Sequence, residues 1–249
     1  MLTAFFWGLM ATSSLILGGL IATRVALSKQ IVGIIMAFGA GTLISAVSFE
    51  LVFDAIQKAR LSGSPALGFL AGALAFFGSD VLIAKFVAGR RTNLDASAQS
   101  NLVIPMVLAI ILDGVPESMV IGIGILEGGD VSPAMLAAVF ISNLPEAIAG
   151  SVGMKAGGAS RAAILSLWCV IALVCAAASA AGFCLFGGIS PNWIAFVQAF
   201  SGGAILMMLA NSMMPEAYAH GGKLAGVFTV LGFWVSVAII VFEHSRNVG

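Results

Sequence analysis

Eight apolar runs of about 20 residues follow one another along this chain, separated by short segments rich in glycine, serine, proline and basic residues. A run of this length crosses the hydrocarbon core of a bilayer as one α-helix. Because a bilayer offers no water to unpaired backbone groups, each span must form its own hydrogen bonds as a helix. The sequence therefore predicts an all-α, polytopic membrane protein. The expected spans are 3–24, 31–54, 66–88, 102–125, 132–154, 161–186, 191–216 and 223–243.

The composition supports this fold class and excludes several others. Charged residues make up 9% of the chain and hydrophobic residues 60%, whereas in soluble domains about a quarter of the residues are charged. The alternating pattern of a membrane β-barrel is absent, and a net charge of zero gives no basic patch for nucleic acid. No predicted loop is long enough for a second domain, so we expect residues 1–249 to form a single transmembrane domain. No nucleotide-binding P-loop motif is present, and we expect a protein that is not an enzyme.

The basic residues of the loops predict the orientation, because cytoplasmic loops carry an excess of lysine and arginine. With the N-terminus outside, eight basic residues are cytoplasmic and three are outside. The eight are Arg24, Lys29, Lys85, Arg90, Arg91, Lys155, Arg161 and Lys223, and the three are Lys58, Arg60 and Arg246. We therefore expect a multi-pass protein of the inner (plasma) membrane with both termini outside. The three cysteines all lie in span 161–186 and form neither a disulfide framework nor a metal motif.

Two internal matches predict inverted repeats. At an offset of 162 residues, the segment Ala37-Phe38-Gly39-Ala40-Gly41 aligns with Ala199-Phe200-Ser201-Gly202-Gly203, and the register continues without a gap to Asp54 against Glu216. The two spans concerned run in opposite directions, as in the inverted repeats of many secondary transporters. At an offset of 29, residues 113–118 match residues 142–147 in the same antiparallel sense. Both matches fit three helices, a central pair and three more helices, a 3+2+3 arrangement.

A proline followed at once by a glutamate stands inside each of the two central spans, as Pro116-Glu117 and Pro145-Glu146. Each proline lacks a backbone donor and frees the carbonyl four residues earlier. In hydrocarbon a freed carbonyl needs another partner, and a cation is one such partner. The pattern therefore predicts an ion site, while a simple kink beside a conventionally paired glutamate is the alternative.

Other polar residues share helix faces with these glutamates. Asp113 lies four residues before Glu117, and Ser142 lies four residues before Glu146, with Asn143 beside it. No lysine or arginine occurs inside either span. Buried carboxylates are costly in a membrane and mark functional sites. We therefore expect these side chains to bind a cation near the middle of the bilayer.

Further candidates lie near the ends of the two repeated spans. Glu50 sits deep in its span, and no lysine or arginine lies within four residues of it in the sequence, which favours a functional role. Asp54 lies toward the outer end, where Lys58 follows at i+4, and either an ion pair or a functional role fits it. Glu216 is followed at i+4 by His220, and the two would form either an exit site or a solvated helix end.

The quoted segments resemble the ZIP family (Zrt/Irt-like proteins) of divalent metal transporters, whose fourth and fifth spans carry motifs such as His-Asn-x-Pro-Glu-Gly. The eight spans, the 3+2+3 arrangement and the outside termini also fit a divergent bacterial-type member. The resemblance implies that Glu117 is the acidic ligand of span four, and that Asn143 and Glu146 are ligands of span five. It places Glu50 near the pathway, and it makes Glu216 the acid retained from a span-seven Asp-Glu-x-x-Pro-Glu motif.

The chain also departs from the family pattern. Asp113 stands where the family usually has the span-four histidine, and Ser142 replaces a histidine or glutamine of span five. Segment 162–185 contains no acid, although many bacterial members carry a glutamate there, which argues against a two-metal centre. Oxygen ligands suit harder ions such as Mn, Mg or Ca, whereas the resemblance implies zinc, with Mn or Fe as other candidates.

We therefore expect transport of divalent metal ions toward the cytoplasm, with the metal as transported substrate. The expected partners are this ion, the lipid bilayer and, as an option, a second copy of the chain in a homodimer. One alternative is a transporter of protons or another cation that uses the same carboxylates. Another is a metal-binding membrane protein that does not transport.

Overall fold

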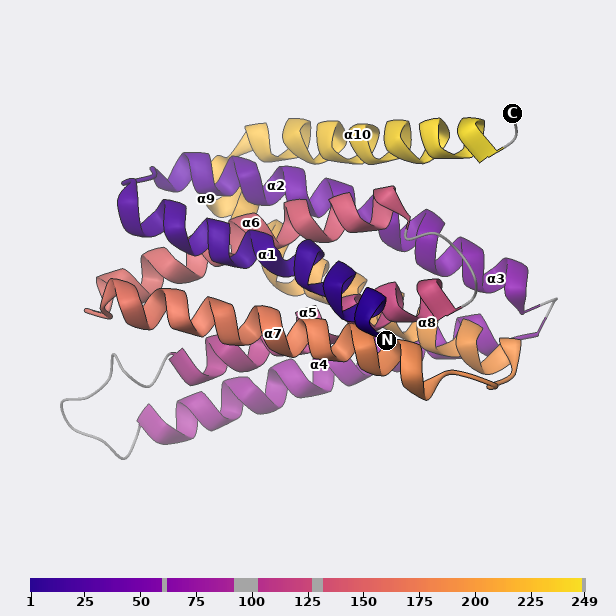
Figure 1. The fold of residues 1–249 in the computed structure, drawn as a ribbon. Helices are drawn as coiled ribbons and strands as arrows, with labels where there is room; N and C mark the ends of the chain where they lie inside the picture. Colours follow the sequence, from indigo (N-terminus) through magenta and orange to yellow (C-terminus); the bar gives the residue numbers. More distant parts are fainter. Residues whose placement is uncertain (60–61, 92–102, 127–131, 248–249) are drawn as a thin grey trace.

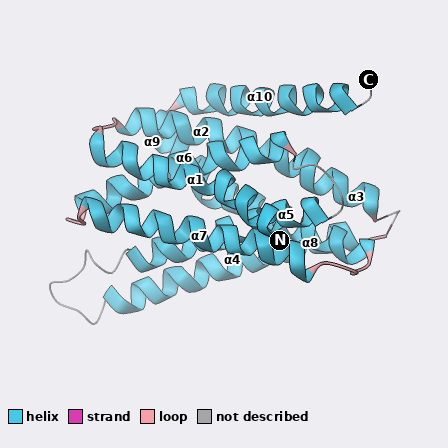
Figure 2. Cartoon of the chain, viewed as in Figure 1, coloured by secondary structure: helices cyan, strands magenta, loops and turns pink. Residues whose placement is uncertain are grey.

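The computed structural model describes the backbone of residues 1–59, 62–91, 103–126 and 132–247, and every regular element in this part of the chain is helical (Figure 2). In chain order the elements are α1 (Leu2–Arg24), α2 (Lys29–Ala46), η1 (Val47–Phe53), α3 (Asp54–Lys58), α4 (Ser64–Arg91), α5 (Val103–Leu126), α6 (Pro133–Ala156), α7 (Arg161–Leu185), α8 (Pro191–Met208), η3 (Leu209–Met213), α9 (Met214–Gly221) and α10 (Lys223–Asn247). Because α2, η1 and α3 are continuous, as are α8, η3 and α9, they form two long rods.

Serine and proline residues set where several of these helices begin. Ser28, Ser132 and Ser160 are N-caps whose hydroxyl oxygens accept bonds from backbone N–H groups of the first turn at 3.2–3.3 Å. Pro133 and Pro191 occupy the first helical position, where a missing donor costs nothing. The reversal between α9 and α10 passes through Gly222 at φ 60°, a conformation that glycine adopts without strain.

Seven helices in the described residues are long and apolar enough to cross a membrane. They are Leu2–Arg24, Lys29–Lys58, Ser64–Leu82, Met135–Ala156, Arg161–Leu185, Pro191–Gly221 and Lys223–Phe242. Within α5, the part Gly114–Leu126 is also apolar but shorter. The predicted all-helical, multi-pass character is confirmed. Each predicted span overlaps one helix or one long rod, with ends that differ by a few residues.

The helices pack as a bundle around the two long rods (Figure 1). Helix α10 lies along α2 and α4 lies along α8, while α1 contacts both α6 and α7 and α5 packs on α7. The long rods are largely buried, whereas α4 and α10 expose most of their surface and lie at opposite edges of the bundle in Figure 1. Their exposed leucine, valine and aromatic side chains suit contact with lipid.

Two glycines allow the peripheral helices to approach the rods. A Cβ at Gly41 would collide with the carbonyl oxygen of Thr229 on α10, and one at Gly203 would collide with that of Phe69 on α4. In membranes, such small residues permit the close backbone contact on which helix association depends.

Each long rod contains a π-helical segment, and the two segments begin at Val47 and Leu209, 162 residues apart. In the first, the Ser48 hydroxyl donates to the carbonyl of Ile44 at 2.7 Å, which competes with the regular helical bond. Beside the second, Pro215 has no N–H to donate. Segments of this kind often lie at functional sites, and neither was predicted from the sequence.

Candidate functional site

The two Pro-Glu turns lie on α5 and α6, with Pro116 and Pro145 inside their helices. Each proline leaves its helix one backbone donor short, and each glutamate projects from the turn that follows. The Glu117 side chain is 2% exposed, and that of Glu146 is half-buried. The carboxylates are close enough to repel each other across the helix pair. These two predicted residues therefore come together.

No basic side chain compensates this pair within the described residues. The Lys58–Asp54 contact is the ion pair found there, and it involves neither Glu117 nor Glu146. The Glu146 carboxylate is also repelled by that of Glu216 on α9. Glu146 is thus within electrostatic reach of two other acids, one on α5 and one on α9. A cation that settled beside Glu146 would relieve both repulsions.

Ser142 and Asn143 line the turn of α6 that precedes Pro145, and both are at least 97% buried. The Ser142 hydroxyl donates to the Val139 carbonyl at 3.1 Å, so its oxygen lone pairs remain for another partner. The Nδ2 atom of Asn143 is buried with no hydrogen-bond partner in the described part of the chain. Because a half-turn exchanges the amide nitrogen and oxygen, this position can present an oxygen ligand instead. Both residues therefore fit a cation beside Glu146.

The rod containing α2 covers this turn of α6 at a glycine. A Cβ at Gly39 would lie 3.1 Å from Ser142 Cα and 3.4 Å from the Ile141 carbonyl oxygen, which Pro145 leaves without its helical donor. The Met213 methyl group meets the same point from η3 at 3.1 Å. Both long rods therefore lie against the turn of α6 that precedes Pro145.

Sequence reasoning missed Cys175 of α7 as a neighbour of the site. This buried thiol lies beside the Ser118 side chain and within electrostatic reach of Glu117 and Glu146. It also faces Gly114, where a Cβ would lie 2.8 Å from the sulfur. The only sequence signal was the small residue at position 114, which leaves room for a side chain from another helix.

The remaining predicted site residues differ in exposure, and the side chain of one lies outside the described residues. The backbone of Asp113 belongs to α5, but its side chain lies outside the described residues. Glu50 is half-buried on η1, whereas Glu216 is exposed on α9. His220 lies one turn beyond Glu216 and has a buried Nδ1 with no hydrogen-bond partner in the described part. In the described residues, no three His, Cys, Asp or Glu side chains converge into a complete metal cage.

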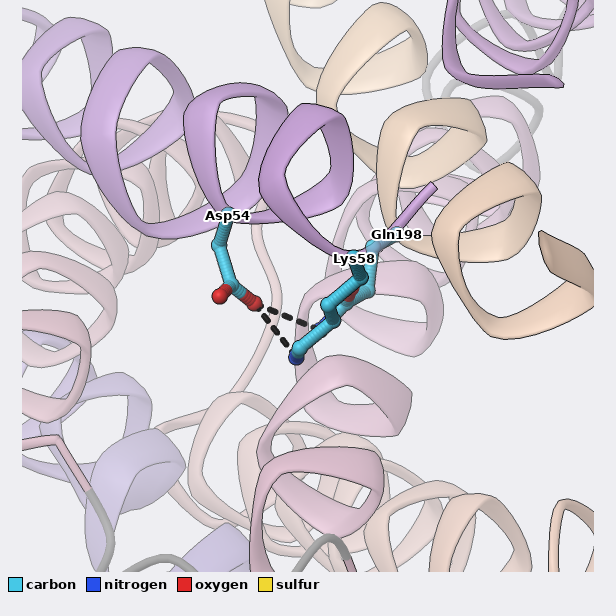
Figure 3. Close-up of polar contacts among 3 residues, drawn as sticks. All are labelled: Asp54, Lys58 and Gln198. Carbon is cyan, nitrogen blue, oxygen red and sulfur yellow. Dashed lines mark hydrogen bonds and ion pairs between the residues drawn. The ribbon is translucent and has the colours of Figure 1, made fainter. Parts of the chain in front are cut away.

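Asp54 forms the ion pair with Lys58 that was one of its two predicted roles. Its Oδ2 atom lies 2.5 Å from the Lys58 ammonium and accepts a bond from Gln198 Nε2 at 3.2 Å (Figure 3). The sequence had left this pairing open against a functional role, and the contact across to α8 was not foreseen.

No protein-family model matches this chain, and no curated protein matches it significantly.

Proposed function

We propose that this protein carries divalent metal ions across a membrane through a site between α5 and α6. Glu117 and Glu146 supply the charge, and Ser142 and Asn143 supply neutral oxygens. Asp113, four residues before Glu117 on α5, completes the proposed set. The observation that carries the proposal is the mutual repulsion of a buried glutamate, Glu117, and a half-buried one, Glu146, with no basic partner among the described residues.

A bound dication relieves the repulsion between these two carboxylates. A carboxylate inside a membrane is costly, and two that face each other are costlier still. A dication cancels both charges at once, and the freed carbonyls beside the prolines add neutral ligands that hard cations accept. One shared proton would cancel only one charge, which is why the proton transporter is the second choice.

The proposed architecture has eight spans, with α5 as the fourth, in a 3+2+3 inverted repeat. Several contacts support it. The 162-residue offset relates the start of η1 to that of η3 and relates Gly41 to Gly203. The packing of α10 on α2 corresponds to that of α4 on α8, and the packing of α1 on α6 corresponds to that of α7 on α5. Since the site lies where the central pair meets both halves, relative movement of the halves would expose it alternately to either side.

The resemblance of the Pro-Glu segments to the ZIP family agrees with this proposal and with passage toward the cytoplasm. The resemblance favours zinc. A ligand set made only of oxygen atoms suits Mn better than a histidine-rich set does. We propose a plasma-membrane location with both termini outside, based on the distribution of basic residues.

The test is metal flux into liposomes that contain the purified protein and an enclosed metal-sensitive dye. We expect saturable uptake of Zn²⁺ or Mn²⁺ that is lost in Glu117→Gln/Glu146→Gln and retained in the matched control Glu243→Gln, which changes a carboxylate near the end of α10. Flux of protons alone under a pH gradient would favour the proton transporter. Tight metal binding without flux would favour a non-transporting protein.

A further inference from the structure

A polar cluster ties the end of α3 to α8 (Figure 3). Asp54 accepts from Lys58 on its own helix and from Gln198 on α8 through the same oxygen, Oδ2. The Gln198 side chain is 3% exposed, whereas those of Asp54 and Lys58 are 40% and 26% exposed. The amide therefore reaches out from the interior to a carboxylate at the rim. We call these three residues the rim cluster.

The buried part of the interface beneath the rim cluster consists of small side chains, with Phe69 of α4 packed against them. Ala55 and Ala59 of α3 pack with Ala195 and Ala199 of α8, and all four are at most 2% exposed. In a bilayer, burying such methyl groups against protein gains little over burying them against lipid. The rim cluster is thus a directional polar contact that ties this end of α3 to α8.

The equivalent place in the second half of the chain is built differently. At the 162-residue offset, Asp54 corresponds to Glu216 and Lys58 corresponds to His220. A lysine ammonium neutralises a carboxylate but cannot ligate a metal while charged, whereas a neutral imidazole ligates metals well. The first repeat therefore carries a cationic side chain, Lys58, at the position where the second repeat carries a metal-binding side chain, His220.

We propose that the rim cluster is a cation-operated latch in which Lys58 occupies the place of an arriving divalent metal ion at Asp54. This inference rests on the proposed transport function. A dication at Oδ2 competes with both N–H donors, because its double charge outweighs that of a single ammonium. Lys58, at the rim, is then released toward solvent. Loss of the Gln198 bond frees the end of α3 from α8 and opens the pathway at this end.

The first test is Mn²⁺ binding, followed by electron paramagnetic resonance on the full-length chain in nanodiscs. All variants carry Glu117→Gln/Glu146→Gln, so the central site is silent. We expect Lys58→Met to raise Mn²⁺ affinity at least tenfold, Lys58→Arg to leave it low, and Asp54→Asn to abolish the gain. Unchanged affinity in Lys58→Met, or a gain that survives Asp54→Asn, would overturn the latch.

A second measurement tests whether α3 moves away from α8. Spin labels at Gln57 on α3 and Trp193 on α8, both exposed, report the separation of the two helices in a background without the native cysteines. We expect the distance distribution to broaden toward longer values in Gln198→Leu, which removes the donor to Asp54, or when saturating Zn²⁺ is added. A narrow, unchanged distribution in both cases would contradict the latch. Failure of the proposed function is distinguishable, because it would appear as wild-type Mn²⁺ binding that Glu117→Gln/Glu146→Gln does not reduce.

Discussion

Glu117 and Glu146 each follow a proline, so each carboxylate leaves a helical turn whose backbone is already one hydrogen bond short. Replacing either glutamate by glutamine keeps the shape and removes the charge. A hydrogen bond or ligand contact to a charged group contributes about 1.5–3 kcal/mol, and every 1.4 kcal/mol corresponds to about tenfold in affinity. We expect Glu117→Gln and Glu146→Gln each to weaken metal affinity by roughly 10- to 100-fold in the flux assay. Wild-type affinity in a correctly folded variant would place the site elsewhere.

We expect the ion selectivity of the proposed site to depend on Asp113. Imidazole is a better partner for zinc than a carboxylate is, while carboxylate oxygen suits manganese. We expect Asp113→His to shift the competition between the two ions toward zinc by roughly tenfold, which uptake from mixtures of Zn²⁺ and Mn²⁺ measures. An unchanged ratio, with the variant shown to be folded, would remove Asp113 from the ligand set.

Sequence reasoning reached the site at some residues and not at others, for a physical reason. A proline followed by a glutamate in an apolar run can be recognised from the local sequence. Glu117 and Glu146 were therefore predicted, and they lie within electrostatic reach of each other. Cys175 and Met213 reach the same region from distant helices. Their proximity depends on how α7 and η3 pack, which no local pattern records. The i+4 spacing of Asp54 and Lys58 indicated their possible ion pair. The bond from Gln198 to Asp54 joins residues 144 positions apart, and no local pattern indicates it.

The positions of the helices could be predicted from the lengths of the apolar runs, because few backbone structures other than a helix can cross a bilayer. The predicted ends of spans 31–54 and 191–216 fell short, since the rods continue to Lys58 and Gly221. The charged side chains beyond these ends suggested a boundary. The helices instead continue past them at the end of the bundle, where polar groups are tolerated.

Close contact between elements depends on single glycines. A Cβ at Gly41 would strike the Thr229 carbonyl, whereas one at Gly226 on α10 meets nothing within 4 Å. Overpacking a tight contact costs about 1–3 kcal/mol, and alanine in an open helix position gains about 0.5–1 kcal/mol over glycine. We therefore expect Gly41→Ala to lower the thermal midpoint in nanodiscs and Gly226→Ala to keep or raise it. Equal midpoints would mean that α10 does not pack on α2 as described.

For the whole molecule, the direction of the proposed transport depends on how the chain is oriented in the membrane. The Ser62 hydroxyl donates to Asn192 at 3.4 Å, so the loops around residues 62 and 190 lie at the same end of the bundle. Single cysteines at Ser62, Thr92 and Ser190, with the native cysteines replaced by alanine, report the side of each loop to an impermeant thiol reagent on intact cells. We expect labelling at 62 and 190 but not at 92. Labelling at 92 alone would exchange entrance for exit, and labelling of 62 without 190 would contradict the packing.

The proposed function requires Glu117 and Glu146 to share one transported metal ion. Anomalous diffraction from crystals grown with Mn²⁺ locates that ion directly, because manganese scatters anomalously and the protein hardly does at the same wavelength. We predict one strong peak between α5 and α6, within bonding distance of a carboxylate oxygen from each glutamate and absent in Glu117→Gln/Glu146→Gln. A fully occupied manganese position elsewhere, with none between these two helices, would contradict the account.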